Sequence, residues 1–281
     1  PSPVMATISL LALRAFTISG ASQVDVNNVT VDGSNAAATI DIAGANIDLN
    51  GSAYQVANGI AGNADEITFT GAVDLHANVT VTGGGGGAGA DPSDTVTFDG
   101  ALGASTGASG ENLTVIAGDG DVSVTGQIGG SSGTLRRVGT VELRTGAAVD
   151  LSYDSGDTEV HSVGSLLIGV NNGTLGAGTE SPVTSVTITD DVDASAGNVR
   201  ILTNGAGTPI DIQAVTSNGN SVELVANDAV VVGGAVDSSG GTGTLRVRTQ
   251  DGTSDMGLGT ASLNSGANVG LYIADGSLRS E

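Results

Sequence analysis

The feature that most constrains this chain is a short, recurring unit in which one polar residue separates two apolar residues. The two apolar side chains of such a unit point to one side and the middle residue to the other, as in a β-strand with one buried face. Clusters of Gly, Asn, Asp and Ser, the residues that tight turns favour, separate the units. No stretch has the apolar spacing of an amphipathic helix over a useful length. The sequence therefore predicts an all-β protein with very short strands, among them Val29/Val31, Ile40/Ile42, Ile47/Leu49, Val73/Leu75, Val96/Phe98 and Val122/Val124.

Three of these units lie at a constant interval in the C-terminal half. They begin at Val199, Val222 and Leu245, 23 residues apart. Self-similarity at such a period indicates a solenoid or a propeller, but propeller blades need about 40 residues and usually carry periodic aromatic residues. Aromatic residues make up only 2% of this chain. We therefore expect a parallel β-helix, a β-solenoid with turns of about 20–25 residues, stacked about 4.8 Å apart into on the order of twelve turns.

The same interval predicts a column of charges. Arg200, Glu223 and Arg246 are the middle residues of the three units, so they should point outward and lie one above another. Exposed ion pairs contribute only about 0–1 kcal/mol each, so such a column would mainly favour the correct register. Earlier turns are less regular, which we attribute to insertions at corners, the run Gly83–Gly87 and its continuation to Asp91 being the clearest case.

Composition and charge exclude several classes of protein. Glycine contributes 46 residues and cysteine none, while 39% of the residues are hydrophobic, so a core of small branched side chains is available without disulfides or thiolate metal sites. The net charge is −22 and all eight basic residues are arginine. Arg136, Arg137 and Arg144 form the nearest approach to a basic patch, and almost no aromatic residue accompanies them. Nucleic acid is therefore not an expected partner.

The expected organisation is one long repeat region after a short leading segment. We assign residues 1–20 to an N-terminal cap, linker or inter-subunit segment, and residues 21–281 to a single continuous β-solenoid. The apolar stretch from Met5 to Phe16 is interrupted by Arg14 and is too short to span a bilayer, so membrane insertion is not expected. It also lacks the features of a signal peptide. We interpret the chain as a piece of a longer polypeptide.

Several segments in succession carry a resemblance to a known class of proteins. They are Ile67–Leu75, Val79–Gly84, Asn112–Val115, Gly120–Gly126 and the stretch from Met256 to Leu271. Together they resemble the repetitive passenger regions of filamentous-haemagglutinin-like exoproteins and autotransporter adhesins, over roughly residues 20–281. The resemblance implies a right-handed parallel β-helix, export from a bacterium, and display on or release from the cell surface. The Asn-Pro-Asn-Leu type of secretion motif is not in this sequence, which leaves the export route open.

Parallel β-helices also include polysaccharide-cleaving enzymes, so the carboxylates were weighed as catalytic groups. Such enzymes pair two carboxylates in a groove with aromatic rings that stack on sugars. This chain has no Trp and no Lys, and its tyrosines are Tyr54, Tyr153 and Tyr272. We therefore expect no enzyme activity and assign no catalytic, cofactor-binding or metal-ligating residue, the acidic clusters considered being Asp119/Asp121, Asp154/Asp157 and Asp190/Asp191/Asp193.

Metal binding has one candidate in the sequence. Gly86–Asp91 matches the start of a calcium-binding nonapeptide repeat, but it occurs once and Pro92 breaks it. Glycine and aspartate also serve corners for backbone reasons alone, so we favour a turn and keep calcium as the alternative. The two histidines, His76 and His161, are far apart in the sequence and are interpreted as outward strand residues.

These observations lead to one functional hypothesis and one alternative. The chain is expected to be a non-enzymatic structural or adhesive protein, a rod- or filament-forming segment of a large secreted bacterial exoprotein, outside the cell or on its surface. Its expected partners are further copies of itself and host, cell-surface or matrix glycans and proteins. The alternative is a carbohydrate-active β-helix that cleaves or binds polysaccharide.

Overall fold

The computed structural model describes residues 8–9, 14–34, 36–57, 64–83, 94–105, 110–130, 136–152, 160–169, 183–194, 197–205, 210–226, 230–238 and 242–249. In these ranges the regular secondary structure consists of strands without helices, and all strands pair in parallel. The expected all-β parallel solenoid is confirmed. Within the same ranges, no helix has the length and apolar character needed to cross a membrane.

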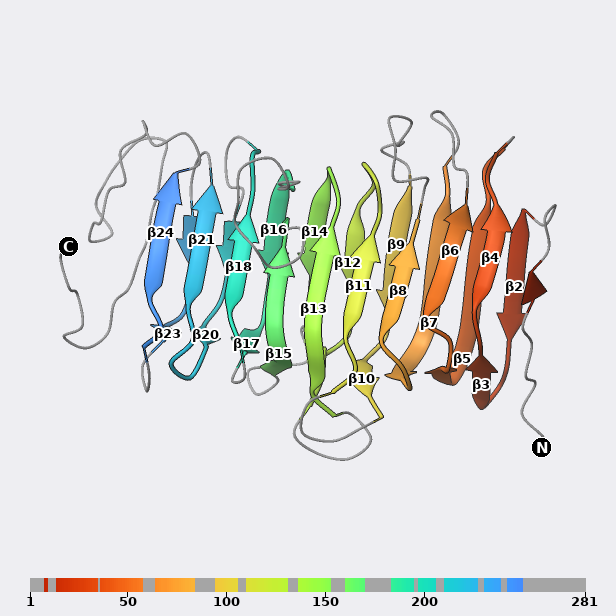
Figure 1. Ribbon diagram of the computed structural model, residues 1–281, viewed down its shortest axis with the longest axis horizontal. Helices are drawn as coiled ribbons and strands as arrows, with labels where there is room; N and C mark the ends of the chain where they lie inside the picture. The colour runs from red at the N-terminus through yellow and green to blue at the C-terminus, as the bar shows by residue number, and fades with distance from the viewer. Residues whose placement is uncertain are drawn as a thin grey trace.

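Each coil of the solenoid has three sides. In one coil, β16 (Ser185–Ile188), β17 (Asp191–Asp193) and β18 (Val199–Leu202) follow one another along the chain. They pair respectively with β19 (Ile210–Ile212), β20 (Val215–Thr216) and β21 (Val222–Ala226) of the next coil. We call the sides that contain β16, β17 and β18 the first, second and third faces. The strands of successive coils lie side by side along the long axis of the molecule (Figure 1).

The remaining strands fall on the same three faces. The first face also contains β2 (Ala15–Ser19), the first part of β5 (Thr39–Leu49) and of β7 (Glu66–Leu75), β9 (Thr95–Asp99), β12 (Val122–Val124), β14 (Ala148–Leu151) and β22 (Val230–Val232). The second face also contains β3 (Gln23–Val26), the later part of β5 and of β7, β10 (Leu102–Ala104), the start of β15 (Val160–Ile168) and β23 (Val236–Asp237). The third face also contains β1 (Ile8–Ser9), β4 (Val29–Asp32), β6 (Ala53–Ala57), β8 (Val79–Thr82), β11 (Leu113–Ile116), β13 (Val138–Arg144), the rest of β15 and β24 (Leu245–Thr249).

The register confirms the predicted period in the C-terminal half. Val199 pairs with Val222, and Val222 pairs with Leu245, at the expected interval of 23 residues. Earlier coils are longer, since Val81 pairs with Val115, 34 residues further on. The uneven spacing expected for this half is thus confirmed. Because the early coils consume more residues, the third face has ten strands by residue 249, and residues 250–281, which include the expected unit at Met256, lie outside the described residues.

The ladder begins before residue 20. β1 pairs with β4, and β2 pairs with β5. Described residues of the expected cap segment, 1–20, therefore already belong to coil strands. The protruding loop expected around residues 83–91 lies between β8 and β9, and residues 84–93 are outside the described ranges.

The interior is filled by the inward residues of all three faces. Nearly every apolar residue at an inward position is buried, most of them Val, Ile and Leu. One aromatic column interrupts this pattern, where Phe69 and Phe98 of adjacent coils stack with ring centroids 4.9 Å apart. Tyr54 meets the edge of Phe69 at 6.0 Å, and its hydroxyl donates a hydrogen bond of 2.7 Å to the carbonyl of Val26. Burial raises the pKa of Tyr54 to about 12.

Asparagine side chains fasten the corner that leads into the third face. Asn28, Asn112 and Asn198 each stand immediately before a third-face strand. The Oδ1 atom of Asn112 accepts the backbone N–H of Thr140 in the next coil at 2.7 Å, and that of Asn198 accepts the N–H of Ser221 at 2.9 Å. Backbone donors that turn away from the strand ladder are thus satisfied by the neighbouring coil, as buried polar groups require.

Glycine is required where the first face bends into the second. Gly71 has a φ of +123° and Gly100 a φ of +148°, a region that side chains rarely adopt. A Cβ atom on Gly71 would also overlap the carbonyl oxygen of Gly44 in the preceding coil. Both backbone conformation and coil spacing therefore exclude larger residues at this corner.

The predicted charge column is present on the third face. Arg200 pairs in register with Glu223, which pairs with Arg246. The Glu223 carboxylate lies 4.0 Å from Arg200 Nε and 3.9 Å from Arg246 Nη1. The flanking side chains leave the Glu223 side chain only 10% exposed, so it points outward but is largely covered.

We expect Gly71→Ala to destabilise the fold by about 2–4 kcal/mol, because it adds backbone strain and overlap with the neighbouring coil. Gly83→Ala is a suitable control, since the nearest atom to its added Cβ would be a Val96 methyl group at 3.1 Å. Urea denaturation of both variants measures the difference. Equal midpoints for the two variants would contradict this account of the corner.

Candidate functional site

A column of aspartates runs along the outside of the second face near the N-terminal end. Asp25 of β3 pairs in register with Asp48 of β5, and Asp48 pairs with Asp74 of β7. Each is the polar residue between two buried apolar residues, so the alternation of the strand points all three carboxylates outward. Like charges at the spacing of adjacent strands are mutually destabilising.

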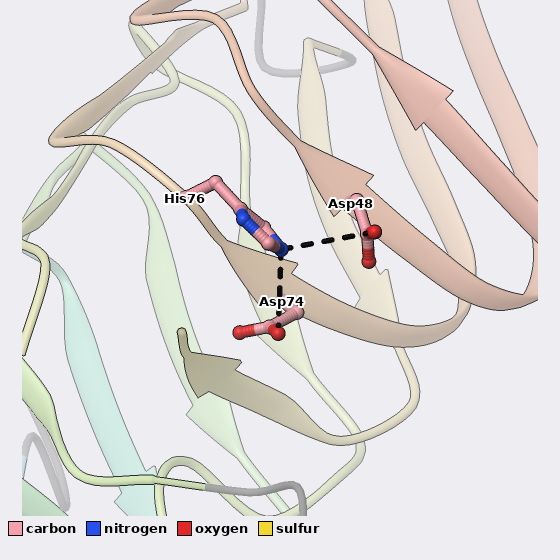
Figure 2. A group of neighbouring side chains, drawn as sticks. All are labelled: Asp48, Asp74 and His76. Carbon is pink, nitrogen blue, oxygen red and sulfur yellow. Dashed lines mark ion pairs between the residues drawn. The ribbon is translucent and has the colours of Figure 1, made fainter. Parts of the chain in front are cut away.

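His76 joins this column where β7 ends. Its Nε2 atom lies 3.7 Å from Asp48 Oδ2 and 3.5 Å from Asp74 Oδ2 (Figure 2). The backbone N–H of His76 donates a 3.0 Å hydrogen bond to the carbonyl of Leu49 in the preceding coil, which fixes the start of the side chain. Among the described residues, Asp48, Asp74 and His76 form the one group of three whose possible metal-ligating atoms all lie within 4.8 Å of one another.

The surroundings of the two carboxylates disfavour their charge. Burial raises the pKa of Asp48, and the neighbouring Asp25 carboxyl adds to the rise, while His76 and Gln23 act in the opposite direction. Burial also raises the pKa of Asp74, with His76 opposing it. Gln23 Nε2 donates a 2.9 Å hydrogen bond to Asp25 and a second hydrogen bond to Asp48, so one amide bridges the two acids. The group is therefore rich in acceptors and poor in compensating donors.

Sequence reasoning missed this group although the signal was present. The units Ile47/Leu49 and Val73/Leu75 place Asp48 and Asp74 in the outward middle position, by the rule that predicts the Arg200 column. The interval between the two aspartates is 26 residues rather than 23, so the constant period of the C-terminal half did not align them. His76 follows Asp74 by two residues and therefore lies on the same side of the chain.

The acidic clusters weighed for catalysis are used by the corners of the coil. Asp121 Oδ1 accepts the backbone N–H of Ala148 at 3.0 Å, and Asp191 Oδ1 accepts that of Ala214 at 3.0 Å. Asp119 is exposed, and Asp154/Asp157 lie outside the described residues. Tyr54 is buried in the interior, so it cannot stack on a sugar ring at the surface. Tyr153 and Tyr272 also lie outside the described residues, as does the calcium candidate Gly86–Asp91.

The two histidines differ in their surroundings. His76 is exposed beyond the end of its strand, whereas the interpretation of His161 as an outward residue is wrong. His161 occupies an inward position of β15, in register with the buried Val192. Its Nδ1 atom accepts the backbone N–H of Ile128 at 3.0 Å, and burial lowers its pKa to about 4. The inward position explains the error, since the phase of this short strand places a histidine where neighbouring coils have valine.

The arginines weighed as a basic patch include one that is paired with an acid. Arg144 Nη2 lies 2.6 Å from Glu142 Oε1, and Arg144 Nε donates to the same oxygen at 2.7 Å. Arg136 is exposed and Arg137 is partly buried. The patch therefore carries less free positive charge than the three residues would suggest.

A shallow groove of about 490 Å³ runs along the corner between the first and second faces. Glycine, alanine, serine and threonine side chains line it, namely Ser19, Gly20, Ala21, Ala43, Gly44, Thr70 and Gly71. This lining provides neither a charged nor an aromatic group to orient a ligand, so the groove follows from the small residues that the corner requires.

We expect stability to fall between about pH 6.5 and pH 4 because of His161. The folded state holds the imidazole neutral down to its lowered pKa of about 4, while the unfolded chain binds the proton near the ordinary value of 6.5. The unfolded state therefore gains protons first, at a cost to the folded state of roughly 3 kcal/mol over this interval. His161→Asn retains an acceptor for the Ile128 N–H and removes the titration. Denaturation across this range should give a smaller slope for His161→Asn than for the matched variant His76→Asn, and equal slopes would contradict the assignment.

Comparison with protein-family models, curated proteins and solved structures found no match to this chain. The fold is therefore established by the strand register, and function has to be argued from the side chains that the register places together.

Proposed function

We propose that this chain is a rod-forming segment of a large bacterial exoprotein, with a structural or adhesive role and no enzyme activity. The observation that carries the proposal is the continuous parallel ladder from β1 to β24 (Figure 1). Each coil pairs with the coils before and after it, so length grows by repetition of local contacts. A fold of this kind separates or displays what lies at its ends.

The surface chemistry supports a location outside the cell. A net charge of −22 with no lysine keeps a long rod soluble and repels nonspecific partners of the same sign. The resemblance of the repeats to adhesin passenger regions favours a bacterial cell surface as the site of display. Partners are then further copies of the chain, joined through strand edges at coil ends, and surface or matrix glycans and proteins.

The described carboxylates favour a scaffold over a polysaccharide-cleaving enzyme. Asp121 and Asp191 hold backbone N–H groups of the next coil, a role that serves the fold. The groove at the corner between the first and second faces offers no aromatic ring for a sugar.

Removal of one complete coil should shorten the rod and leave it folded. Deleting residues 199–221 joins Asn198 to Val222, which takes the register of Val199. We expect circular dichroism to retain the β signal, and small-angle scattering to show a rod shorter by about 4.8 Å. Deleting residues 199–210 instead removes about half a coil, misplaces every later strand and should lower the melting temperature sharply. Equal loss of structure in both deletions would contradict a modular rod.

Localisation and the absence of catalysis are tested on the producing bacterium and the purified chain. We expect antibodies to label intact cells or the medium, and we expect no release of reducing ends from a panel of acidic and neutral polysaccharides. Labelling that requires permeabilised cells would overturn the surface role. Polysaccharide cleavage that persists in several independent preparations would overturn the non-enzymatic role.

A further inference from the structure

The cluster of Asp48, Asp74 and His76 has the donor set of a metal site. Two carboxylate oxygens and one imidazole nitrogen suit zinc and related divalent ions of the first transition series. Calcium and magnesium prefer oxygen ligands alone, so the histidine selects against them. Two negative charges also match the charge of one divalent cation.

The distances are those of ligands around a common centre. Zinc bonds to nitrogen and oxygen measure about 2.0–2.2 Å, which places tetrahedral ligand atoms about 3.4 Å from one another. His76 Nε2 lies 3.5 Å from Asp74 Oδ2 and 3.7 Å from Asp48 Oδ2. These separations exceed the 2.7–3.2 Å of ordinary hydrogen bonds. Side-chain rotation alone can close the remaining gap, because all three ligand atoms already lie within 4.8 Å.

The backbone holds the three residues in place before any ion arrives. Asp48 and Asp74 are register partners in β5 and β7, and the N–H of His76 is fixed to the Leu49 carbonyl. Gln23 donates a hydrogen bond to Asp48 from the coil below. Hydrogen bonds of this kind orient ligating carboxylates in metal sites. Little ordering cost therefore remains for binding.

One oxygen of the cluster lacks a compensating group. Asp74 Oδ1 is a buried atom for which the described residues provide no hydrogen-bond donor. A buried carboxylate oxygen without a donor or a cation is costly. Asp25 continues the same acidic column, and Arg136 acts on Asp74 only as the weakest of its charge partners. A bound cation would supply the missing positive charge.

We propose that Asp48, Asp74 and His76 bind one divalent cation of the zinc class, with water completing the coordination shell. The ion joins β5 to β7 and therefore fastens two adjacent coils on the second face (Figure 2). His76 is 36% exposed, so the site opens to solvent and can load after folding. This site is independent of the adhesive role, since it concerns the cohesion of the coils.

The test is calorimetric titration of the untagged, metal-free full chain with zinc chloride. We expect one equivalent to bind with a dissociation constant in roughly the micromolar range and to raise the melting temperature. His76→Gln and Asp74→Asn should each weaken this binding by about tenfold or more. Asp41→Asn is the matched control, because Asp41 also points outward from β5 but lies on the first face, and it should bind zinc like the parent chain.

Cobalt provides a second readout of the ligand set. Cobalt chloride added to the metal-free chain should give visible absorption bands that zinc displaces and that His76→Gln abolishes. Absence of saturable zinc binding, or zinc affinity unchanged in both ligand variants, would overturn the proposal. Calcium chloride that binds as tightly as zinc and is insensitive to His76→Gln would also overturn it, since imidazole would then have no part in the site.

Discussion

The parallel hydrogen-bond ladder between coils is the constraint on which the rest of the structure depends. Strand side chains alternate between two sides, so a slip of one residue would exchange the interior for the surface throughout a coil. The ladder therefore fixes the core as well as the backbone, and it keeps Phe69 above Phe98 in the aromatic stack. Glycine at Gly71 and asparagine at Asn112 serve the same ladder, because they let the chain turn without leaving backbone groups unpaired.

Register also decides which charges become neighbours. On the third face it sets Glu223 between Arg200 and Arg246, so each coil attracts the next. On the second face it stacks Asp25, Asp48 and Asp74, so adjacent coils repel one another through their side chains. The backbone pairing is the same in both places. A column of like charges that persists in a ladder where one substitution would relieve it is a feature that calls for a cation.

Much of this fold could be predicted from the sequence, because apolar pairs around one polar residue mark the strands of the first and third faces. The second face could not be predicted in the same way. Its later strands contribute few inward residues, such as Val192 in β17 and Val215 in β20, and a single apolar residue has no visible period. His161 stands at such a position, and its burial follows only from its pairing with Val192. The Asp48 and Asp74 pair needed the actual length of one coil, which varies from turn to turn.

The uniform interior has a consequence for where chemistry can reside. Inward positions are occupied mainly by Val, Ile and Leu in every coil, and each is closed above and below by its counterparts, so the described interior is given over to packing. Ligands must then be met by the outward columns, where one residue per strand is repeated at the coil spacing. A column formed from a single residue type gives a ladder, whereas a column joined by a residue from a strand end, as His76 joins Asp48 and Asp74, gives a converging set of donors. Sites on a coil of this kind are therefore expected where a face ends and the next corner begins.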